Sequence, residues 1–360
     1  MRLLTISNMY PTPQWPGYGV FVKNFVTSLE EEGHEVDLSA IHGKSSSRLG
    51  KIKKYVKMTL SIYSNLATKK YDLIYVHFGS HSLLPFLPIY IFLKTPMVVN
   101  FHGEDLLPRS TTEKIISKFT KPIIQKARLI VVPSYFFRDI ASERYPDSTI
   151  FISPSGGVNT RVFKPGKELD WSGKPINYGF ISRIDEGKGW QCFLKAMCIL
   201  KSEYNYKKFK ATIIGNGDQA SMLEAEITKL GLKDLVTYQG PLPHHSLASA
   251  IQDFTFFVFP TELPESLGLV AIEAMACGIP VIGSNTGATS EYIDEGVNGY
   301  TFSKGDAEEL AKKLNTATTL PTAELRKLSL GALSTAKRYD ANITSELLIS
   351  KLEEIVENRS

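Results

Sequence analysis

The sequence predicts an α/β protein of two doubly wound domains, each built on a parallel β-sheet. At 360 residues the chain is longer than the span over which one hydrophobic core usually grows, so two domains are expected. Short apolar runs typical of buried strands alternate with segments of helical periodicity, and this series occurs twice. A Gly- and Pro-rich stretch, residues 154–170, separates the two series and is the expected linker. Hydrophobic residues at 43% and charged residues at 22% exclude a disordered or collagen-like chain.

The first half opens with a βαβ unit. A strand is expected at residues 3–7, and apolar side chains then recur at helical spacing from Phe21 to Leu29. Gly33 closes this helix, and a second strand is expected at 35–40. Three further buried strands are expected at residues 73–76, 97–101 and 129–132. Helical or mixed segments join them, so these strands should form one parallel sheet.

The second half repeats the pattern. Its expected strands are residues 176–181, 210–215, 236–239, 254–260 and 280–284. Its expected helices are residues 189–204, 219–230 and 267–277. Because open α/β sheets bind ligands at the carboxyl ends of their strands, we expect the active site in a cleft where two such sheets face each other. The expected domains are residues 1–165, residues 166–335, and a terminal helical segment, 336–360, that crosses back to the first domain.

Two glutamates eight positions apart mark the strongest motif. Glu265 precedes an expected helix, and Glu273 lies inside it. A helix that begins near Ser266 offers unpaired amides and a positive dipole end to an anion, and Glu265 beside it can accept hydrogen bonds from sugar hydroxyls. Glu273 lies about 80° further around the helix axis and can bind the two hydroxyls of a ribose. The alternative is that Ser266 caps the helix and Glu273 is a solvated surface residue, but apolar neighbours of Glu273 favour a buried carboxylate that needs a partner.

A second motif follows the strand expected at residues 176–181. Arg183 offers a planar fork for bidentate phosphate contact, and Lys188 offers a mobile point charge. The turn between them contains Gly187, so both cations can converge on one diphosphate. Taken alone, this motif also fits an ordinary surface turn.

Together the two motifs resemble the retaining glycosyltransferases of family four, the glycosyl transferases group 1. The resemblance implies the GT-B architecture, in which two Rossmann-like domains face each other across a cleft. It implies that Arg183 and Lys188 hold the donor diphosphate, that Glu265 binds the donor sugar, and that Glu273 binds the ribose. It adds three donor-binding residues at the start of the expected helix: Ser266, Leu267 and Gly268.

The resemblance covers nearly the whole chain. Residues 9–19 are similar to the family's amino-terminal signature, in which Gly17 and Gly19 would contact the donor. His102 stands after a strand where such enzymes place a His near the reacting carbon, which implies a catalytic role. Two departures are visible: Ser182 precedes the phosphate-binding arginine where Gly is common, and one residue separates the two glycines of the signature.

The activity implied is that of a retaining, metal-independent hexosyltransferase. It would move a sugar from a nucleoside-diphosphate sugar, a UDP-sugar, to a glycan or lipid-linked acceptor in cell-surface polysaccharide biosynthesis. The catalytic residues expected are His102, Arg183, Lys188 and Glu265. We expect no other cofactor, no bound metal and no nucleic-acid partner. Two alternative functions remain open, a nucleotide-sugar epimerase of the same architecture and a non-catalytic sugar-binding subunit. The oligomeric state also remains open.

A basic amphipathic segment predicts contact with an anionic membrane. Six Lys and Arg residues lie between Lys44 and Lys57, and apolar positions 49, 52, 56 and 60 fall on one helical face. Residues 1–170 hold 22 Lys/Arg against 14 Asp/Glu, a balance of +8, and residues 171–360 hold 19 against 23, a balance of −4. The ordinary alternative is a helix that packs its apolar side on the sheet.

The expected location is the cytoplasm, peripherally on the inner face of the cell membrane. The first seven residues lack the apolar core of a signal peptide, and no apolar run approaches the roughly 20 residues that span a bilayer. The odd number of cysteines, three, indicates reduced core thiols rather than disulfides or metal ligands.

Overall fold

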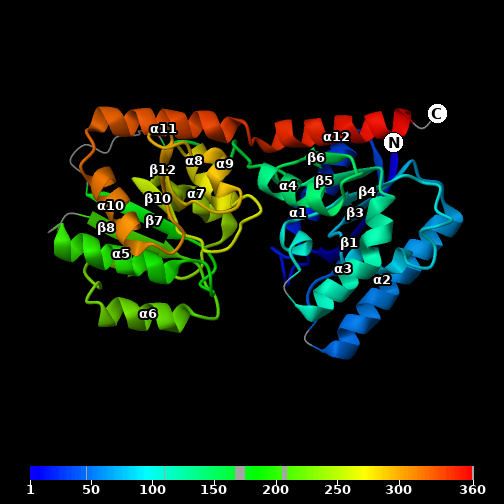
Figure 1. Ribbon diagram of the computed structural model, residues 1–360, viewed down its shortest axis with the longest axis horizontal. Coiled ribbons are helices and arrows are strands. Elements are labelled where there is room, and N and C mark those ends of the chain that lie inside the picture. The colour runs from blue at the N-terminus through cyan, green and yellow to red at the C-terminus, as the bar shows by residue number, and fades with distance from the viewer. Residues whose placement is uncertain (46, 109, 167–174, 205–208, 359–360) are drawn as a thin grey trace. The chain divides into compact units, whose positions relative to one another are not determined.

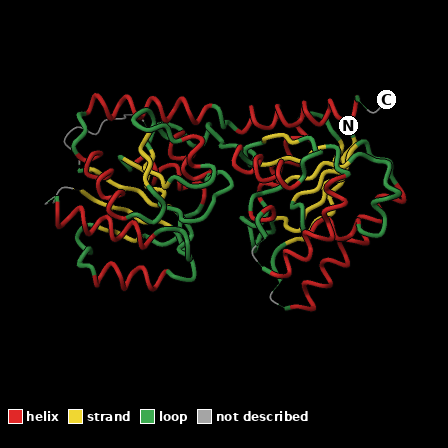
Figure 2. The backbone as a smooth tube through the Cα atoms, viewed as in Figure 1, coloured by secondary structure: helices red, strands yellow, loops and turns green. Residues whose placement is uncertain are grey.

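The computed structural model describes all residues except 46, 109, 167–174, 205–208 and 359–360. The chain forms two compact units, unit 1 (Met1–Gly156 with Asn342–Ser360) and unit 2 (Gly157–Ala341), shown in Figure 1. Each unit holds a six-stranded parallel sheet, and Figure 2 shows helices on both sides of the strands in each. The prediction of two doubly wound α/β domains is therefore confirmed.

The sheet of unit 1 has the strand order β2-β1-β3-β4-β5-β6. Its strands are β1 Arg2–Tyr10, β2 Glu35–His42, β3 Leu73–His77, β4 Met97–Asn100, β5 Leu129–Val132 and β6 Ile150–Ile152. The fully buried runs of β3 and β5 are typical of parallel strands that are covered on both faces. β6 was not predicted, because a three-residue edge strand has no periodicity to read.

Two helical layers cover this sheet. One contains α2 Arg48–Thr68, the 3-10 helix η1 His81–Phe86, α3 Thr111–Gln125 and α4 Tyr135–Arg144, whose buried side chains share one core. The other contains α1 Val20–Glu31 and α12 Ala341–Glu357. The crossovers from β2 onward all advance in the same direction along the sheet, so right-handed connections place their helices on one side. A short 3-10 helix, η2 Glu104–Leu106, follows β4.

The sheet of unit 2 has the strand order β12-β11-β10-β7-β8-β9. Its strands are β7 Ile176–Ile181, β8 Phe209–Ile214, β9 Val236–Tyr238, β10 Phe256–Phe259, β11 Val281–Ser284 and β12 Gly299–Phe302. Its helices are α5 Trp190–Glu203, α6 Ala220–Lys229, α7 His244–Gln252, α8 Leu269–Ala276, α9 Thr289–Tyr292, α10 Ala307–Thr318 and α11 Thr322–Lys337. Helices α5, α6 and α10 pack on one face of the sheet, and α7 and α8 pack on the other.

The chain enters and leaves unit 2 at one place. Val158 N–H donates to the Tyr339 carbonyl at 2.7 Å, and Ala341 N–H donates to the Val158 carbonyl at 2.9 Å. Residues 157–165 therefore belong to unit 2, whereas the sequence assigns them to the first domain. Residues 167–170 of the expected linker lie outside the described residues.

The units divide the charge differently from the two halves of the sequence. Unit 1 holds 21 Lys/Arg and 16 Asp/Glu, and unit 2 holds 20 and 21. The acidic helix α12 joins unit 1, so the contrast of +8 against −4 becomes +5 against −1. Among the described residues, no helix combines the length and the apolar character needed to cross a membrane.

Candidate functional site

The order of strands in unit 2 reverses between β7 and β10. From β7 the sheet continues through β8 and β9 in one direction, and from β10 it continues through β11 and β12 in the other. Ligands of doubly wound sheets bind at the carboxyl ends of the strands beside such a reversal. Arg183 and Lys188 follow β7, and Glu265 follows β10, so all three lie in loops that flank this point.

Backbone contacts bring the loops after β7 and β10 together. Glu262 N–H donates to the Gly187 carbonyl at 2.8 Å. Gly189 caps α5 with a φ of 77°, and a Cβ atom there would stand 1.7 Å from the Pro260 carbonyl oxygen. Only glycine can therefore occupy this position. The loop that carries the cations is thus fixed against the loop that carries Glu265.

An ion pair joins the two motifs. Lys188 Nζ lies 2.7 Å from Glu265 Oε1, and the two side chains are only 14% and 17% exposed. The Thr261 hydroxyl donates to the same carboxylate oxygen at 2.9 Å. Lys188 and Glu265, 77 positions apart in the sequence, therefore meet at one partly desolvated site. Both can contact the same small ligand there.

Arg183 occupies a more open position. Its guanidinium contacts the Asp185 carboxylate at 2.9 Å, and its side chain is 68% exposed. The other Asp185 oxygen accepts the amide N–H of Asp218 at 3.0 Å, which ties the loop after β7 to the glycine turn after β8. The Asp185 contact fixes the position of the Arg183 side chain. Most of the guanidinium remains exposed, so its N–H groups can still bind a ligand.

Glu273 has a partner that the sequence did not indicate. Its side chain, 13% exposed, accepts from His244 Nε2 at 3.4 Å, and the His244 ring also packs edge-on against Phe163. The hydrogen bond with Glu273 raises the pKa of His244 above its usual value, while burial opposes it. The interpretation of Glu273 as a solvated surface residue is therefore wrong.

The helix that carries Glu273 begins later than expected. Gly268, with a φ of 74°, is the N-cap of α8, and no side-chain hydrogen bond caps this terminus. Ser266 and Leu267 lie in the preceding loop, so Ser266 is not the cap. Glu265 also lies outside the helix, and the helical angle expected between the two glutamates does not apply. The uncapped amides of α8 remain suited to an anion.

The predicted residues of unit 1 lie at the corresponding reversal, between β1 and β3. Gly19 is the N-cap of α1 with a φ of 77°, and a Cβ atom there would meet the Met9 carbonyl at 2.8 Å. Gly17 lies two residues earlier, where a side chain would meet nothing within 4 Å. From the first turn of α1, Phe21 packs on His102 with ring centroids 4.4 Å apart. The structure thus brings the glycine loop and His102 to one edge of this sheet.

His102 is one of a pair of neutral histidines. Its Nε2 lies 3.1 Å from Nδ1 of His77, the last residue of β3. Phe21 and Phe78 enclose the His102 ring, and this burial lowers the pKa of His102 to about 3. Burial, and then the neighbouring His102, lower the pKa of His77 as well. His102 therefore acts near neutral pH as a hydrogen-bonding group rather than as a cation.

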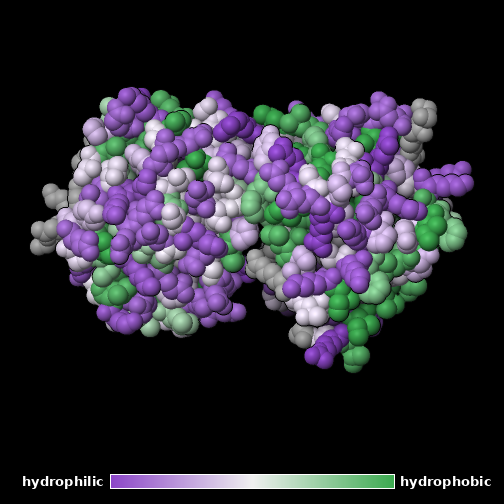
Figure 3. Space-filling model, viewed as in Figure 1, coloured by the Kyte–Doolittle hydropathy of each residue, from purple (hydrophilic) through white to green (hydrophobic). Residues whose placement is uncertain are grey.

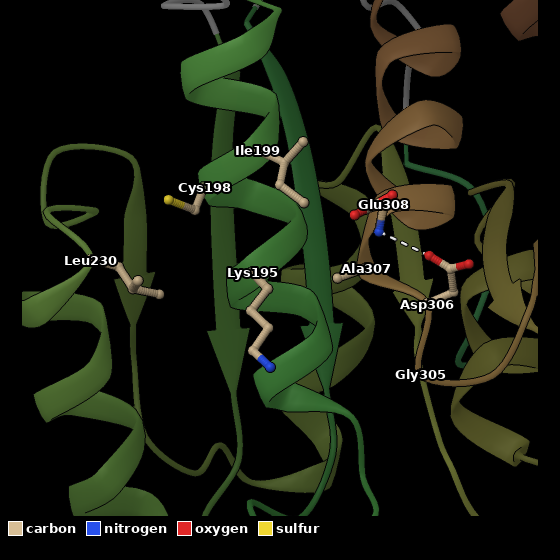
Figure 4. A pocket seen from close by; sticks show the side chains of 8 residues that line it. All are labelled: Lys195, Cys198, Ile199, Leu230, Gly305, Asp306, Ala307 and Glu308. Atoms are coloured by element: carbon tan, nitrogen blue, oxygen red, sulfur yellow. Dashed lines mark hydrogen bonds between the residues drawn. The ribbon is translucent and has the colours of Figure 1, made fainter.

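A hollow on unit 2 lies apart from these residues. It is lined by α5, by Leu230 and by the start of α10, as Figure 4 shows, and none of the predicted site residues lines it. Within the described ranges, no group of three or more His, Cys, Asp or Glu side chains is arranged to hold a metal ion.

Comparison with protein families places the chain. The model described as glycosyl transferases group 1 matches residues 166–329, and the model described as Glycosyltransferase Family 4 matches residues 16–156. The chain belongs to the group 1 glycosyltransferases. The resemblance seen in the sequence is thereby confirmed.

Relatives of this group 1 glycosyltransferase include the amylovoran biosynthesis glycosyltransferase AmsK of Erwinia amylovora. The two are 27% identical over 246 residues, which are 67% of this chain and 60% of AmsK. The chain spans between 36 and 60% of the length of the curated relatives compared.

Solved structures show the same fold. Sucrose-phosphate synthase from Thermosynechococcus elongatus matches with a TM-score of 0.81 and 18% identity, over 100% of this chain and 99% of that one. Anabaena Alr3699/HepE in complex with UDP-glucose matches with a TM-score of 0.73 and 19% identity, over 98% of this chain and 100% of that one. The fold of this group 1 glycosyltransferase is therefore GT-B.

Sequence reasoning missed the partners that hold the motif residues. These are His77, Asp185, His244 and Thr261. His77 and His244 contact residues that are 25 and 29 positions away, so spacing gives no signal for them. Asp185 and Thr261 lie within four residues of their partners, but in loops that have no regular spacing. The one available hint was position, because His77 ends a buried strand and Thr261 follows one.

Proposed function

We propose that this protein is a retaining hexosyltransferase that moves a sugar from a UDP-sugar to a glycan or lipid-linked acceptor. The observation that carries the proposal is the Lys188–Glu265 pair, held at 2.7 Å beside the uncapped start of α8. A nucleoside-diphosphate sugar presents an anion and sugar hydroxyls next to each other, and this pair offers one group for each. That HepE was solved with UDP and with UDP-glucose supports a UDP-sugar as the donor.

Unit 2 is the donor-binding domain in this proposal, and unit 1 binds the acceptor. Arg183 and Lys188 hold the diphosphate, and the backbone amides from Ser266 through Gly268 into the first turn of α8 add further donors. Glu273 binds the ribose hydroxyls in place of its present partner His244. Gly17 leaves room for the ligand to approach the backbone of unit 1, and Gly19 holds this loop close to Met9.

Catalysis in this proposal rests on the charge of the leaving group. The bond from the anomeric carbon to the diphosphate oxygen breaks through an oxocarbenium-like state, and negative charge grows on that oxygen. One unit charge pair at 4 Å is worth about 4 kcal/mol at an effective dielectric of 20, so two cations can stabilise this charge without a metal ion. We therefore propose a metal-independent reaction, in which activity survives chelation by EDTA.

Retention follows from attack on the face that the diphosphate leaves. The acceptor hydroxyl oxygen bonds to the anomeric carbon, and its proton passes to the departing phosphate oxygen. His102, neutral and enclosed by Phe21 and Phe78, donates or accepts one hydrogen bond to the donor sugar at this stage.

Polysaccharide biosynthesis is the setting we propose, at the cytoplasmic side of the cell membrane. The relative AmsK is named for amylovoran biosynthesis, which supports a glycan product. The three cysteines are free, in keeping with a reducing compartment.

The test separates this proposal from its alternatives. The protein is first screened by thermal shift against nucleotide sugars, where a ligand at 100 times its dissociation constant stabilises by about 2.7 kcal/mol. The best donor is then incubated with and without a glycan acceptor. Release of UDP that depends on acceptor supports transfer, an epimerised donor identifies an epimerase, and binding without turnover identifies a sugar-binding subunit.

A further inference from the structure

The outer surface of unit 1 carries an apolar stripe that the rest of the described chain leaves exposed. Four large apolar side chains of α2 are 52 to 79% exposed: Leu49, Ile52, Val56 and Leu60. Met58 and Ile62, on another side of the helix, pack into the core beneath the sheet. The helix therefore turns one apolar face to the sheet and a second to solvent. The ordinary alternative, in which the stripe packs on the sheet, is wrong.

A second helix on the same side of the sheet repeats this pattern. Ile115 and Phe119 of α3 are 52% and 61% exposed, four residues apart and so on one helical face. α2 and α3 pack on the same core, so their outer faces belong to one layer of unit 1. The segment between η1 and β4 adds Ile91 and Phe92, and their neighbours pack against that same core.

Exposed apolar side chains gather on unit 1 rather than being scattered. Of the large apolar side chains that are exposed among the described residues, thirteen belong to unit 1 and four to unit 2, and eight of the thirteen lie on α2, on α3 or in the segment between η1 and β4. Figure 3 shows hydrophobic atoms following the position of α2 in the lower right of the view. Single exposed apolar residues are ordinary, whereas a contiguous group marks an interaction surface.

The positive charge of α2 and α3 favours an anionic partner. α2 contains five Lys and Arg residues and no Asp or Glu. α3 contains three lysines and one acid, Glu113, whose side chain is engaged in the capping box with Ser110. Eight cations against one carboxylate on two helices that pack on the same core fit an anionic partner.

We propose that the outer faces of α2 and α3 dock reversibly on an anionic lipid membrane. The aliphatic and aromatic side chains enter the boundary between headgroups and acyl chains, and the lysines beside them meet lipid phosphates. Nucleic acid would bind the lysines through its phosphates, but it would leave the apolar stripe exposed to water. The inference goes beyond the proposed function, and it rests on that function only in placing a lipid-linked acceptor at this surface.

One lysine of α2, Lys54, binds the backbone of unit 1 instead of facing solvent. Lys54 Nζ donates to three backbone carbonyls at the end of β2, those of His42, Gly43 and Lys44. Replacing Lys54 would disturb the fold, so the test variant leaves it unchanged.

The experiment is co-sedimentation of the full chain with vesicles of phosphatidylcholine, alone or mixed with phosphatidylglycerol. The parent should bind the anionic vesicles strongly, bind neutral ones weakly, and lose binding as salt rises. Each lysine near an anionic leaflet adds about 1 kcal/mol, so removing three should weaken partitioning by roughly 100-fold. The variant combines Lys51→Gln, Lys53→Gln and Lys57→Gln. The matched control removes three exposed lysines of unit 2: Lys233→Gln, Lys304→Gln and Lys312→Gln.

A second variant tests the apolar contribution. It combines Ile52→Gln, Val56→Gln and Leu60→Gln, and we expect at least a tenfold loss of partitioning because burial of these side chains is removed. Its control replaces exposed apolar residues of unit 2: Met222→Gln, Val297→Gln and Leu330→Gln.

Three results would overturn the proposal. They are equal sedimentation of parent and variants, equal loss in variants and controls, and equal binding to neutral and anionic vesicles. Analytical ultracentrifugation adds a fourth, because a dimer that the apolar variant abolishes would assign the surface to a second copy of the chain. Sedimentation needs neither donor nor acceptor, so its failure is distinct from a failure of the proposed transfer activity.

Discussion

The two cations after β7 differ in how the protein holds them, and this predicts different responses to removal. Lys188 is largely buried against Glu265, whereas Arg183 is mostly exposed and pairs with Asp185. Because both would act on charge that develops in the transition state, Lys188→Ala and Arg183→Ala should each lower kcat roughly 100-fold. Lys188→Ala should also lower the melting temperature, because it leaves Glu265 partly buried without its cation.

Steady-state kinetics and thermal denaturation check these two effects. Lys195→Ala is the matched control, since Lys195 is an exposed lysine of unit 2 on α5. Either site variant turning over like the parent would remove that residue from the proposed mechanism.

The pair formed by His244 and Glu273 predicts a donor KM that depends on pH. The raised pKa of His244 means that the pair is stabilising below the ordinary pKa of 6.5 and is lost as pH rises through the raised value. In the protonated state, His244 would compete for Glu273 with the ribose hydroxyls of the proposed donor. We therefore expect the donor KM to fall as pH rises from 5.5 to 8.5, and His244→Ala to flatten this dependence. The same slope in both proteins would separate His244 from donor binding.

The neutral His102 predicts how unit 1 responds to acid. With a pKa of about 3 in the folded state, His102 stays unprotonated at pH values where the unfolded chain binds a proton. The free energy of unfolding should therefore fall as pH decreases below about 6, by about 1.4 kcal/mol per pH unit for each such histidine. His102→Gln should make this fall shallower. Denaturant titrations between pH 7.5 and 4.5 measure both slopes, and parallel slopes would contradict the lowered pKa.

At the scale of elements, the proposed donor site depends on a glycine at the start of α5. Gly189→Ala adds a Cβ atom 1.7 Å from the Pro260 carbonyl oxygen, so the loops after β7 and β10 must separate. Gly231→Ala is the matched control, because Gly231 also has a positive φ but nothing within 4 Å of its Cβ position. The control should cost about 1 kcal/mol of unfolding free energy, and Gly189→Ala at least about 3 kcal/mol.

UDP binding distinguishes the two glycine variants further. Gly189→Ala should lose the thermal shift given by UDP, and Gly231→Ala should keep it. Equal behaviour would show that the close contact of the two loops does not shape the site.

The sequence predicted the elements whose pattern is local. β5 and β7 coincide with the expected strands, because β5 is a continuous buried run of apolar residues and the last four residues of β7 are buried. β12 begins at a glycine and lies at the sheet edge, and α7 begins with two histidines, so neither carries a clear periodic signal. The sequence predicted too early a start for α8, because Ser266 is a common N-cap residue. The N-cap is Gly268, which adopts a left-handed conformation.

In the candidate site too, the sequence predicted residues with a local pattern and missed the contacts between distant residues. Arg183, Lys188, Glu265 and Glu273 could be proposed from the sequence because the first three follow strands and Glu273 lies inside a helix among apolar neighbours, and the family resemblance named them. The pairs that hold them were not identifiable. A contact such as Lys188 with Glu265 joins residues 77 positions apart, and its existence depends on the reversal of strand order between β7 and β10. Spacing in the sequence carries no information about that order.

At the scale of the whole molecule, unit 2 is inserted into unit 1. The chain leaves unit 1 at Gly156 and returns at Asn342, and the entering and leaving segments pair through Val158. The returning helix α12 completes unit 1, because Leu348 and Leu352 are buried against β1 and β3. Of the terminal segment that the sequence placed as a third region, residues 336–341 belong to unit 2, and the described residues from Asn342 onward belong to unit 1.

This topology predicts that the two units differ when they are produced separately. A fragment of residues 157–341 keeps both of its cores and its paired ends, so it should fold cooperatively and bind UDP. A fragment of residues 1–156 lacks α12 and uncovers the apolar surface beneath it, so it should aggregate or unfold at a lower temperature. Adding a peptide of residues 342–358 should raise that temperature, whereas a peptide with Leu348→Asp and Leu352→Asp should not. Circular dichroism melts measure each case, and equal stability of the fragment with and without the intact peptide would show that α12 does not complete the core of unit 1.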